Sequence, residues 1–274
     1  MRIDSHQHFW KYDTVRNSWI TDDMQIIRRD FLPEDLLTPL VGNAIDGCVA
    51  VQADQSEEET DFLLGLAAEN DFVKGVVGWV DLCAENVGER LQFYANNPNF
   101  KGVRHILQGE VPEFMLQKSF QYGISQLRQY NLTYDILIYP HQLAASIQLV
   151  NQFPEQAFVM DHLAKPYIRK GNIADWKKDM EALAKHQNVC CKLSGMVTEA
   201  DWKNWKASDI RPYMDVVLDA FGADRIMYGS DWPVCLLAGD YGQVLDLVQS
   251  YIKGLSQPEQ EAVMGNTAKD FYML

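Results

Sequence analysis

The chain has 274 residues, of which 47% are hydrophobic and 23% charged, so it can bury a large core and does not have the composition of a disordered chain. Its formal net charge of −14 would repel nucleic acids and anionic membranes over most of the surface, so we expect neither as a partner. Five cysteines without a CxxC spacing argue against a disulfide framework and against a cysteine zinc site. No apolar run reaches the roughly 18 residues that a membrane span requires, and residues 1–6 show no signal-peptide core, so we expect a cytoplasmic protein.

Eight short apolar runs along the chain have the character of β-strands. They cover residues 2–6, 46–52, 74–80, 101–106, 133–139, 157–163, 189–194 and 225–231. Stretches with helical spacing separate them, including 85–97, 208–221 and one that opens with the capping-box pair Ser56 and Glu59. Eight strand–helix repeats in 274 residues predict an α/β protein, a (β/α)8 TIM barrel, with residues 1–274 forming one domain. An open doubly wound sheet is the rival fold, but it usually has a glycine-rich first turn, which this chain lacks.

The connection after the first strand, residues 7–32, is unusually long for a compact domain and is rich in aromatic residues. It follows a strand, and barrel active sites form at that end of the strands. We therefore expect it to fold over the site as a partial lid; the alternative is a loop that merely covers the end of the barrel.

Four polar residues stand where strands end, and in a barrel such positions face the active site. His6 and His8 follow the first strand and share one side of it, because side chains alternate along a strand. His162 ends the sixth strand and Asp231 the eighth. A buried core histidine and a turn-capping aspartate are the structural alternatives for these last two. Together the four side chains can hold a divalent metal, or act without one as base and hydrogen-bond donors.

The fourth strand ends in Arg104 and His105, which must face opposite sides. The inward residue would anchor an anionic or carbonyl oxygen of a substrate, whereas an outward Arg104 would form only a surface salt bridge. Lys192 alternates with apolar residues in the seventh strand and can point into the barrel. The sequence has no GxSxG, GxGxxG or Walker motif, so a serine hydrolase or a nucleotide-binding protein is not expected.

Five motifs spread over the whole chain resemble the amidohydrolase superfamily, in its branch of sugar lactonases. They are HQHFW, GVRH, DHLAKP, CKLSGMVTEADW and FGADRIMYGSDWPV. The resemblance implies a hydrolytic barrel in which His6 and His8 match the HxH pair of the first strand. His162 then matches the central histidine of the branch, and Asp231 the aspartate of the eighth strand.

The resemblance also bears on metals. Many members of the superfamily use a carboxylated lysine to bridge two metal ions, but Arg104 and His105 stand here at the end of the fourth strand. The branch includes members that work without metal. We therefore expect that no cofactor is required; the alternative is a single divalent ion, zinc, bound by His6, His8, His162 and Asp231.

These observations predict a hydrolase that opens a sugar-acid lactone of the L-fucono- or L-rhamnono-lactone type. Asp231 would take a proton from the attacking water, and the histidines and Arg104 would donate to the developing oxyanion. The apolar face of the sugar would pack against Trp10, Trp19 and Trp232. His105 is the other candidate for substrate contact.

Three alternatives remain at this point. They are a mononuclear zinc hydrolase, a decarboxylase of the related acid branch, and a non-catalytic protein that binds sugar acids. The last is disfavoured because buried polar groups without partners are costly. A homo-oligomer is one option, since the sequence leaves the oligomeric state open.

Overall fold

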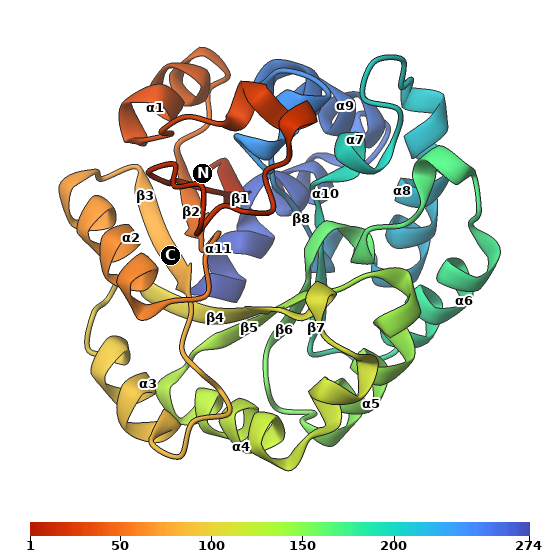
Figure 1. The fold of residues 1–274 in the computed structure, drawn as a ribbon. Coiled ribbons are helices and arrows are strands. Elements are labelled where there is room, and N and C mark those ends of the chain that lie inside the picture. The colour runs from red at the N-terminus through yellow and green to blue at the C-terminus, as the bar shows by residue number, and fades with distance from the viewer.

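The computed structural model describes residues 1–274 and contains eight parallel strands in one sheet, with neighbours in chain order from β1 to β8 (Figure 1). The strands are β1 (Ile3–Gln7), β2 (Gly47–Val51), β3 (Val73–Gly78), β4 (Phe100–Ile106), β5 (Thr133–Leu137), β6 (Phe158–Met160), β7 (Val189–Leu193) and β8 (Ile226–Tyr228). Each lies within or beside one of the eight predicted runs. The predicted (β/α)8 barrel is therefore confirmed.

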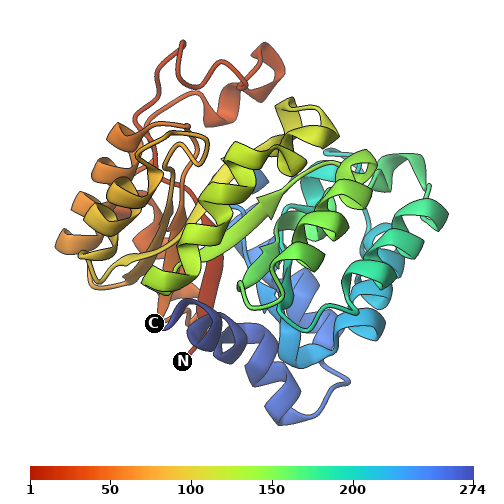
Figure 2. The ribbon, with the colours of Figure 1, turned by 90° about the horizontal axis from the view of Figure 1, so that it is seen from below.

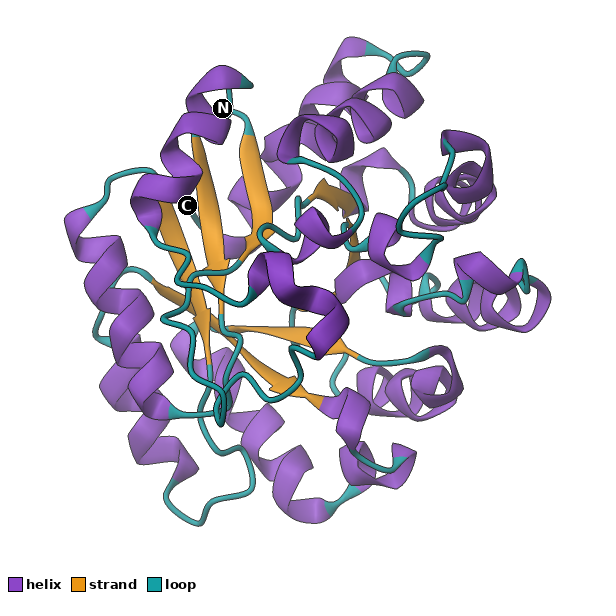
Figure 3. Cartoon of the chain, turned by 45° about the horizontal axis from the view of Figure 1, so that its top comes forward, coloured by secondary structure: helices purple, strands orange, loops and turns teal.

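Helices surround the strands on the outside of the barrel (Figure 3). They are α1 (Pro33–Gly42), α2 (Glu57–Glu69), α3 (Val87–Ala95), α4 (Lys118–Leu127), α5 (Leu143–Gln152), α6 (Ala174–Leu183), α7 (Met196–Glu199), α8 (Ala207–Phe221), α9 (Tyr241–Ile252), α10 (Gln257–Glu261) and α11 (Thr267–Tyr272). Ser56 caps α2 as its pattern predicted, because its hydroxyl accepts a hydrogen bond of 3.2 Å from the backbone N–H of Glu59. None of these helices is both long and apolar enough to cross a bilayer.

One end of the barrel interior, the end near both chain termini and called the lower end below, is filled by apolar side chains. Ile3, Val51, Val159 and Met227 from the strands pack there in one cluster, which α11 closes with Tyr272. Figure 2 shows α11 and both chain termini at this end, opposite the segment that follows β1. Because the lower end is packed shut, a substrate can enter only at the carboxyl ends of the strands.

The barrel closes where the first and last strands meet. The backbone N–H of Asp231 donates to the carbonyl of His6 at 2.8 Å, and that of His8 donates to the carbonyl of Trp232 at 2.7 Å. These bonds lie just beyond β8, at the carboxyl end of the barrel. The chain segments that carry His6, His8 and Asp231 are thus hydrogen-bonded to one another at the seam.

A β-bulge in β1 sets the direction of the two histidines. Asp4 pairs with Cys48 and Gln7 with Ala50, so three steps along β1 match two along β2. Ile3 therefore belongs to the lower apolar cluster while His6, three residues on, also points inward. A strand without the bulge would have placed these two side chains on opposite faces.

Candidate active site

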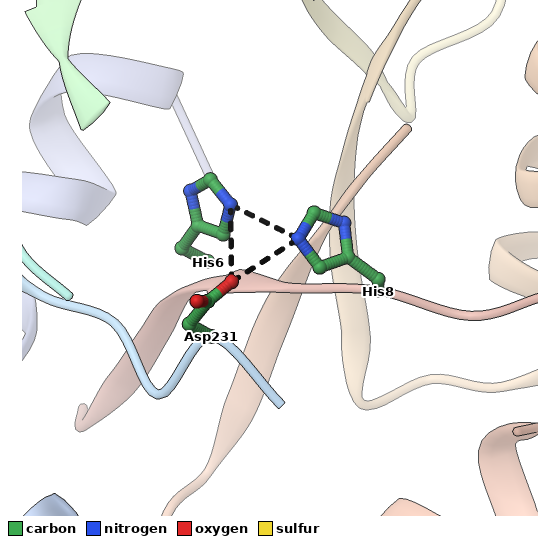
Figure 4. A group of neighbouring side chains, drawn as sticks. All are labelled: His6, His8 and Asp231. Carbon is green, nitrogen blue, oxygen red and sulfur yellow. Dashed lines mark hydrogen bonds and ion pairs between the residues drawn. The ribbon is translucent and has the colours of Figure 1, made fainter. Parts of the chain in front are cut away.

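Four side chains from three places in the chain meet at the upper end of the barrel. Nε2 of His6 and Nε2 of His8 lie 3.2 Å apart. Oδ1 of Asp231 lies 3.3 Å from Nε2 of His8, 4.0 Å from that of His6 and 3.9 Å from that of His162 (Figure 4 shows all but His162). All four residues are buried. The structure thus brings together the four residues that the sequence singled out.

The other ring nitrogen of each histidine is held by a separate partner. Nδ1 of His8 lies 2.7 Å from the carbonyl oxygen of Val51. A carbonyl oxygen only accepts, so this Nδ1 carries a proton, and in the neutral tautomer the lone pair lies on Nε2 of His8. Nδ1 of His162 lies 2.8 Å from Oγ of Ser194. These second partners orient the rings so that Nε2 atoms point at a common position.

His6 belongs to a buried network of charges that reaches down into the barrel. Its Nδ1 lies 3.2 Å from Oδ1 of Asp161, and that oxygen forms an ion pair with Nζ of Lys192 at 3.0 Å. Lys192 also donates to Asp135 at 2.5 Å, and Nη1 of Arg104 donates to the other oxygen of Asp161 at 3.1 Å. Two cations thus face two carboxylates beneath the site, and they fix the position of His6.

Burial and neighbouring charges shift the pKa values of these groups in different directions. Burial lowers the pKa values of His6 and His162 well below the usual value, so both rings are neutral at neutral pH. Burial would raise the pKa of Asp231, but hydrogen bonding and positive charge around it, with Lys165 as the permanent cation, hold that pKa below its usual value. The site therefore pairs an ionised carboxylate with neutral imidazoles.

His162 stands on an unusual turn of the backbone. His162, Leu163, Ala164 and Lys165 all have left-handed conformations, with φ between 47° and 57°. Such residues are strained relative to right-handed ones, and they persist only where surrounding contacts hold them. Trp176 supplies one such contact, because its indole N–H donates to the carbonyl of Leu163 at 2.7 Å.

A cavity of about 370 Å³ opens above the four residues, which is within the lower part of the range of roughly 300–1,000 Å³ typical of small-molecule sites. Its polar lining comprises His8, Arg104, Gln108, Tyr139, His162, Lys165, Thr198, Glu199 and Asp231. Trp19 and Met24 line it from the connection after β1, residues 7–32, which we call the covering segment. Trp202 lines it from the loop after α7. The segment after β1 therefore covers the site, as its length and composition predicted.

The structure separates the remaining candidates. Arg104 faces inward and lines the cavity, whereas His105 faces outward and stacks on Phe114 with ring centroids 5.1 Å apart. The expected substrate contact of His105 is therefore not possible from this position, because β4 stands between its ring and the cavity.

Of the three tryptophans expected to meet the sugar, only Trp19 lines the cavity. Trp10 is buried against Phe31 and Trp19, and its indole N–H donates to the carbonyl of Arg29. Trp232 is buried against Phe31. The expectation that Trp10 and Trp232 contact the sugar is therefore wrong, because both pack against Phe31 and hold the covering segment on the barrel.

Several residues of the site were not singled out from the sequence. Asp135, Asp161 and Ser194 hold Lys192 or the histidines, and Glu199 and Trp202 line the cavity. A signal existed for Asp135, which is the one charged residue in the run 133–139. Asp161 directly precedes His162, and its inward direction follows from the same alternation that places Val159 in the barrel.

The residues present fit a divalent metal ion. Nε2 of His6, Nε2 of His8 and Oδ1 of Asp231 lie within 4.8 Å of one another, and a lone pair of His8 points at the shared position. Four ligand atoms placed tetrahedrally around zinc at roughly 2.0–2.1 Å lie about 3.3 Å from one another. The spacing of 3.2 Å between His6 and His8 and that of 3.3 Å between His8 and Asp231 are close to this value. His6, Asp161 and His162 form a second such group, but Asp161 is already engaged by Lys192 and Arg104.

Comparisons with known proteins agree with the motifs. A family model described as Amidohydrolase matches residues 3–274. L-fucono-1,5-lactonase from Burkholderia multivorans is 39% identical over 286 residues, which cover 100% of this chain and 96% of the relative. L-fucono-1,5-lactonase from Burkholderia ambifaria is 36% identical over 278 residues, with coverage of 100% and 96%.

Solved structures lead to the same family. The crystal structure of an amidohydrolase from Burkholderia multivorans with bound zinc has a TM-score of 0.97 to this chain at 39% identity, and it covers 100% of this chain and 99% of that one. One with bound HEPES has a TM-score of 0.96 at 38% identity and the same coverage. The chain therefore belongs to the amidohydrolase family, as its motifs predicted.

Proposed function

We propose that this protein hydrolyses sugar lactones related to L-fucono-1,5-lactone, with Asp231 as the general base. The observation that carries the proposal is the meeting of the Asp231 carboxylate with three imidazoles beneath a cavity of small-molecule size. Two relatives that carry the name L-fucono-1,5-lactonase align with the whole chain, which supports the choice of substrate.

In the proposed reaction, a water molecule beside Asp231 attacks the lactone carbonyl and gives one proton to the carboxylate. The water oxygen forms a bond to the carbonyl carbon, and the carbonyl oxygen becomes an oxyanion. The bond to the ring oxygen then breaks, and Asp231 returns the proton to the leaving alkoxide. The product is an open-chain hydroxy acid, which loses a proton to solvent at neutral pH.

The hydrogen-bond pattern divides the supporting roles among the neighbours of Asp231. Arg104 lines the cavity, with Nη1 3.3 Å from Nε2 of His6, and it is the cationic donor for the oxyanion. When the hydroxyl of Ser194 donates to Nδ1 of His162, Nε2 of His162 carries a proton and can also donate. His8 has a lone pair on Nε2, so it accepts from the attacking water instead of donating to the oxyanion.

A metal-assisted form of the same hydrolysis is the second candidate, because potential ligand atoms of His6, His8 and Asp231 lie within 4.8 Å of one another. His6, His8, His162 and Asp231 would hold the ion, and zinc is the first candidate because a similar amidohydrolase was solved with zinc bound. The bound ion would polarise the lactone carbonyl as a Lewis acid.

A pH-indicator assay with L-fucono-1,5-lactone tests the proposal, since each turnover releases one equivalent of acid. We expect Asp231→Asn to lower kcat by at least about 10²-fold. Asp219→Asn is the control, because it makes the same change at an exposed position on α8. Near-native kcat in Asp231→Asn would exclude Asp231 as the base. Release of CO₂ from an acid, with no acid produced from lactones, would favour the decarboxylase instead.

The two forms of the proposal are separated by metal content. Protein purified without added metal is analysed for bound zinc and then assayed before and after treatment with a chelator. Full activity at substoichiometric metal would reject the metal-assisted form. Activity that is lost with the ion and restored by zinc would reject the metal-free form.

A further inference from the structure

The cavity contains two cations besides the histidines, and each already faces a carboxylate. Nζ of Lys165 donates to Oε1 of Glu199 at 2.8 Å. Arg104 donates to Asp161 at 3.1 Å and to the backbone carbonyl of Gln52. No other lysine or arginine lines this cavity. A substrate carboxylate that entered it would therefore find no cation without a carboxylate partner, and it would lie near Glu199 and Asp231.

The Lys165–Glu199 pair is held in place from both sides. Lys165 ends the left-handed turn that begins at His162, so one strained segment directs the side chains of His162 and Lys165 toward the cavity. Glu199 is the last residue of α7, which begins just after Gly195 beside the His162 ring. The side chains of Lys165 and Glu199 are 16% and 19% exposed, which leaves polar atoms accessible from the cavity.

We propose that the Lys165–Glu199 pair determines specificity by binding hydroxyl groups of a neutral lactone and excluding lactones that carry a carboxylate. This inference rests on the proposed lactone hydrolysis. A hydroxyl group both donates and accepts, so it can accept from the ammonium of Lys165 while it donates to the carboxylate of Glu199. A carboxylate only accepts, so at the same position it is repelled by Glu199 and cannot compensate for its lost hydration.

The test compares two probes that share one ring. The first is a neutral aldonolactone, and the second is the corresponding aldarolactone, which carries a terminal carboxylate. Their lactams, in which N–H replaces the ring oxygen, resist hydrolysis, so binding is measured apart from turnover. Binding is followed by tryptophan fluorescence, since Trp19 and Trp202 line the cavity.

A hydrogen bond to a charged group corresponds to at least about tenfold in affinity. We therefore expect the wild type to bind the neutral lactam at least about tenfold more tightly than the carboxylated one. Glu199→Gln keeps the shape of the side chain and frees the Lys165 charge. It should tighten binding of the carboxylated lactam about tenfold and weaken the neutral one by up to about tenfold. With the lactones, KM should follow these changes while kcat changes less than about threefold.

Lys165→Met should weaken binding of both lactams, because it leaves Glu199 without a cation. The opposite responses of the two variants to the carboxylated lactam distinguish specificity from a structural role, which would make both variants worse. Glu155→Gln is the control, because it breaks an exposed ion pair with Arg128. Equal changes for both lactams in Glu199→Gln would overturn the inference. Binding of the neutral lactam without hydrolysis of any lactone would overturn the proposed function, whereas the preference of the pair for neutral ligands would still be shown by the two lactams.

Discussion

Replacing Lys192 with methionine should destabilise the fold more than any surface change. Lys192 is fully buried, and its Nζ contacts carboxylates of Asp135 at 2.5 Å and Asp161 at 3.0 Å. Lys192→Met removes the only cation that contacts Asp135, whose remaining partner is the hydroxyl of Tyr272. Leaving a buried charge without its partner costs about 3–5 kcal/mol of unfolding free energy, or roughly 6–20 °C in Tm for a chain of this size.

The loss should depend on pH in a direction that the structure sets. Burial raises the pKa of Asp135 to about 6 even though Lys192 opposes the shift. Without Lys192 that pKa rises further, so the folded state binds a proton that the unfolded state releases near pH 4. The variant should therefore lose stability as the pH rises from about 4 through 6 and beyond.

Urea unfolding at pH 5 and pH 8 measures both effects, provided that the slope m stays equal among the variants. The double variant Lys192→Met/Asp135→Asn removes the unpaired charge, so it should recover part of the loss at pH 8. The reasoning is refuted if Lys192→Met unfolds within about 1 kcal/mol of the wild type at pH 8, or if Asp135→Asn gives no recovery in that background.

Two further predictions concern other parts of the barrel. Burial raises the pKa of Glu59 to about 7, so the wild type should lose up to about 3 kcal/mol of stability from this group between pH 4.5 and 8. Glu59→Gln keeps an acceptor for the N–H of Ala53 and should remove that part of the pH dependence. The prediction is contradicted if the unfolding free energies of both proteins, measured in urea, change with pH by the same amount. Gly195→Ala should lower kcat/KM at least about tenfold, because its Cβ would lie 2.6 Å from Nδ1 of His162 at a φ of +59°. Kinetics of this variant within twofold of the wild type would show that the His162 ring moves freely.

The fold could be predicted from the sequence because its signals are local. Most strands are rich in apolar residues, and the count of eight leaves few closed arrangements. The four central site residues could be found for the same reason, since His6, His8, His162 and Asp231 each stand at or near the end of a predicted strand.

The direction of side chains was harder to predict. Alternation shows that Arg104 and His105 face opposite sides but not which one faces inward, and that choice depends on the packing of His105 against Phe114. The bulge in β1 and the left-handed turn at 162–165 depend on contacts with other elements, β2 and α6, and no local pattern reveals them.

The aromatic residues show a related limit. Trp10, Trp19 and Trp232 are equally suited to contact a sugar or to pack against one another. Their roles depend on how the covering segment folds back, through the pairing of Trp10 with Phe31. That pairing joins residues 21 positions apart, which composition does not predict.

The seam between the first and last strands gives this enzyme a built-in order of assembly. During synthesis the ribosome releases His6 and His8 first, and Asp231 follows only when most of the chain has been made. The backbone bonds that join His6 to Asp231 and His8 to Trp232 also bring the reacting groups together. Activity therefore requires ring closure, and the recovery of turnover during refolding would time the step that joins the first and last strands.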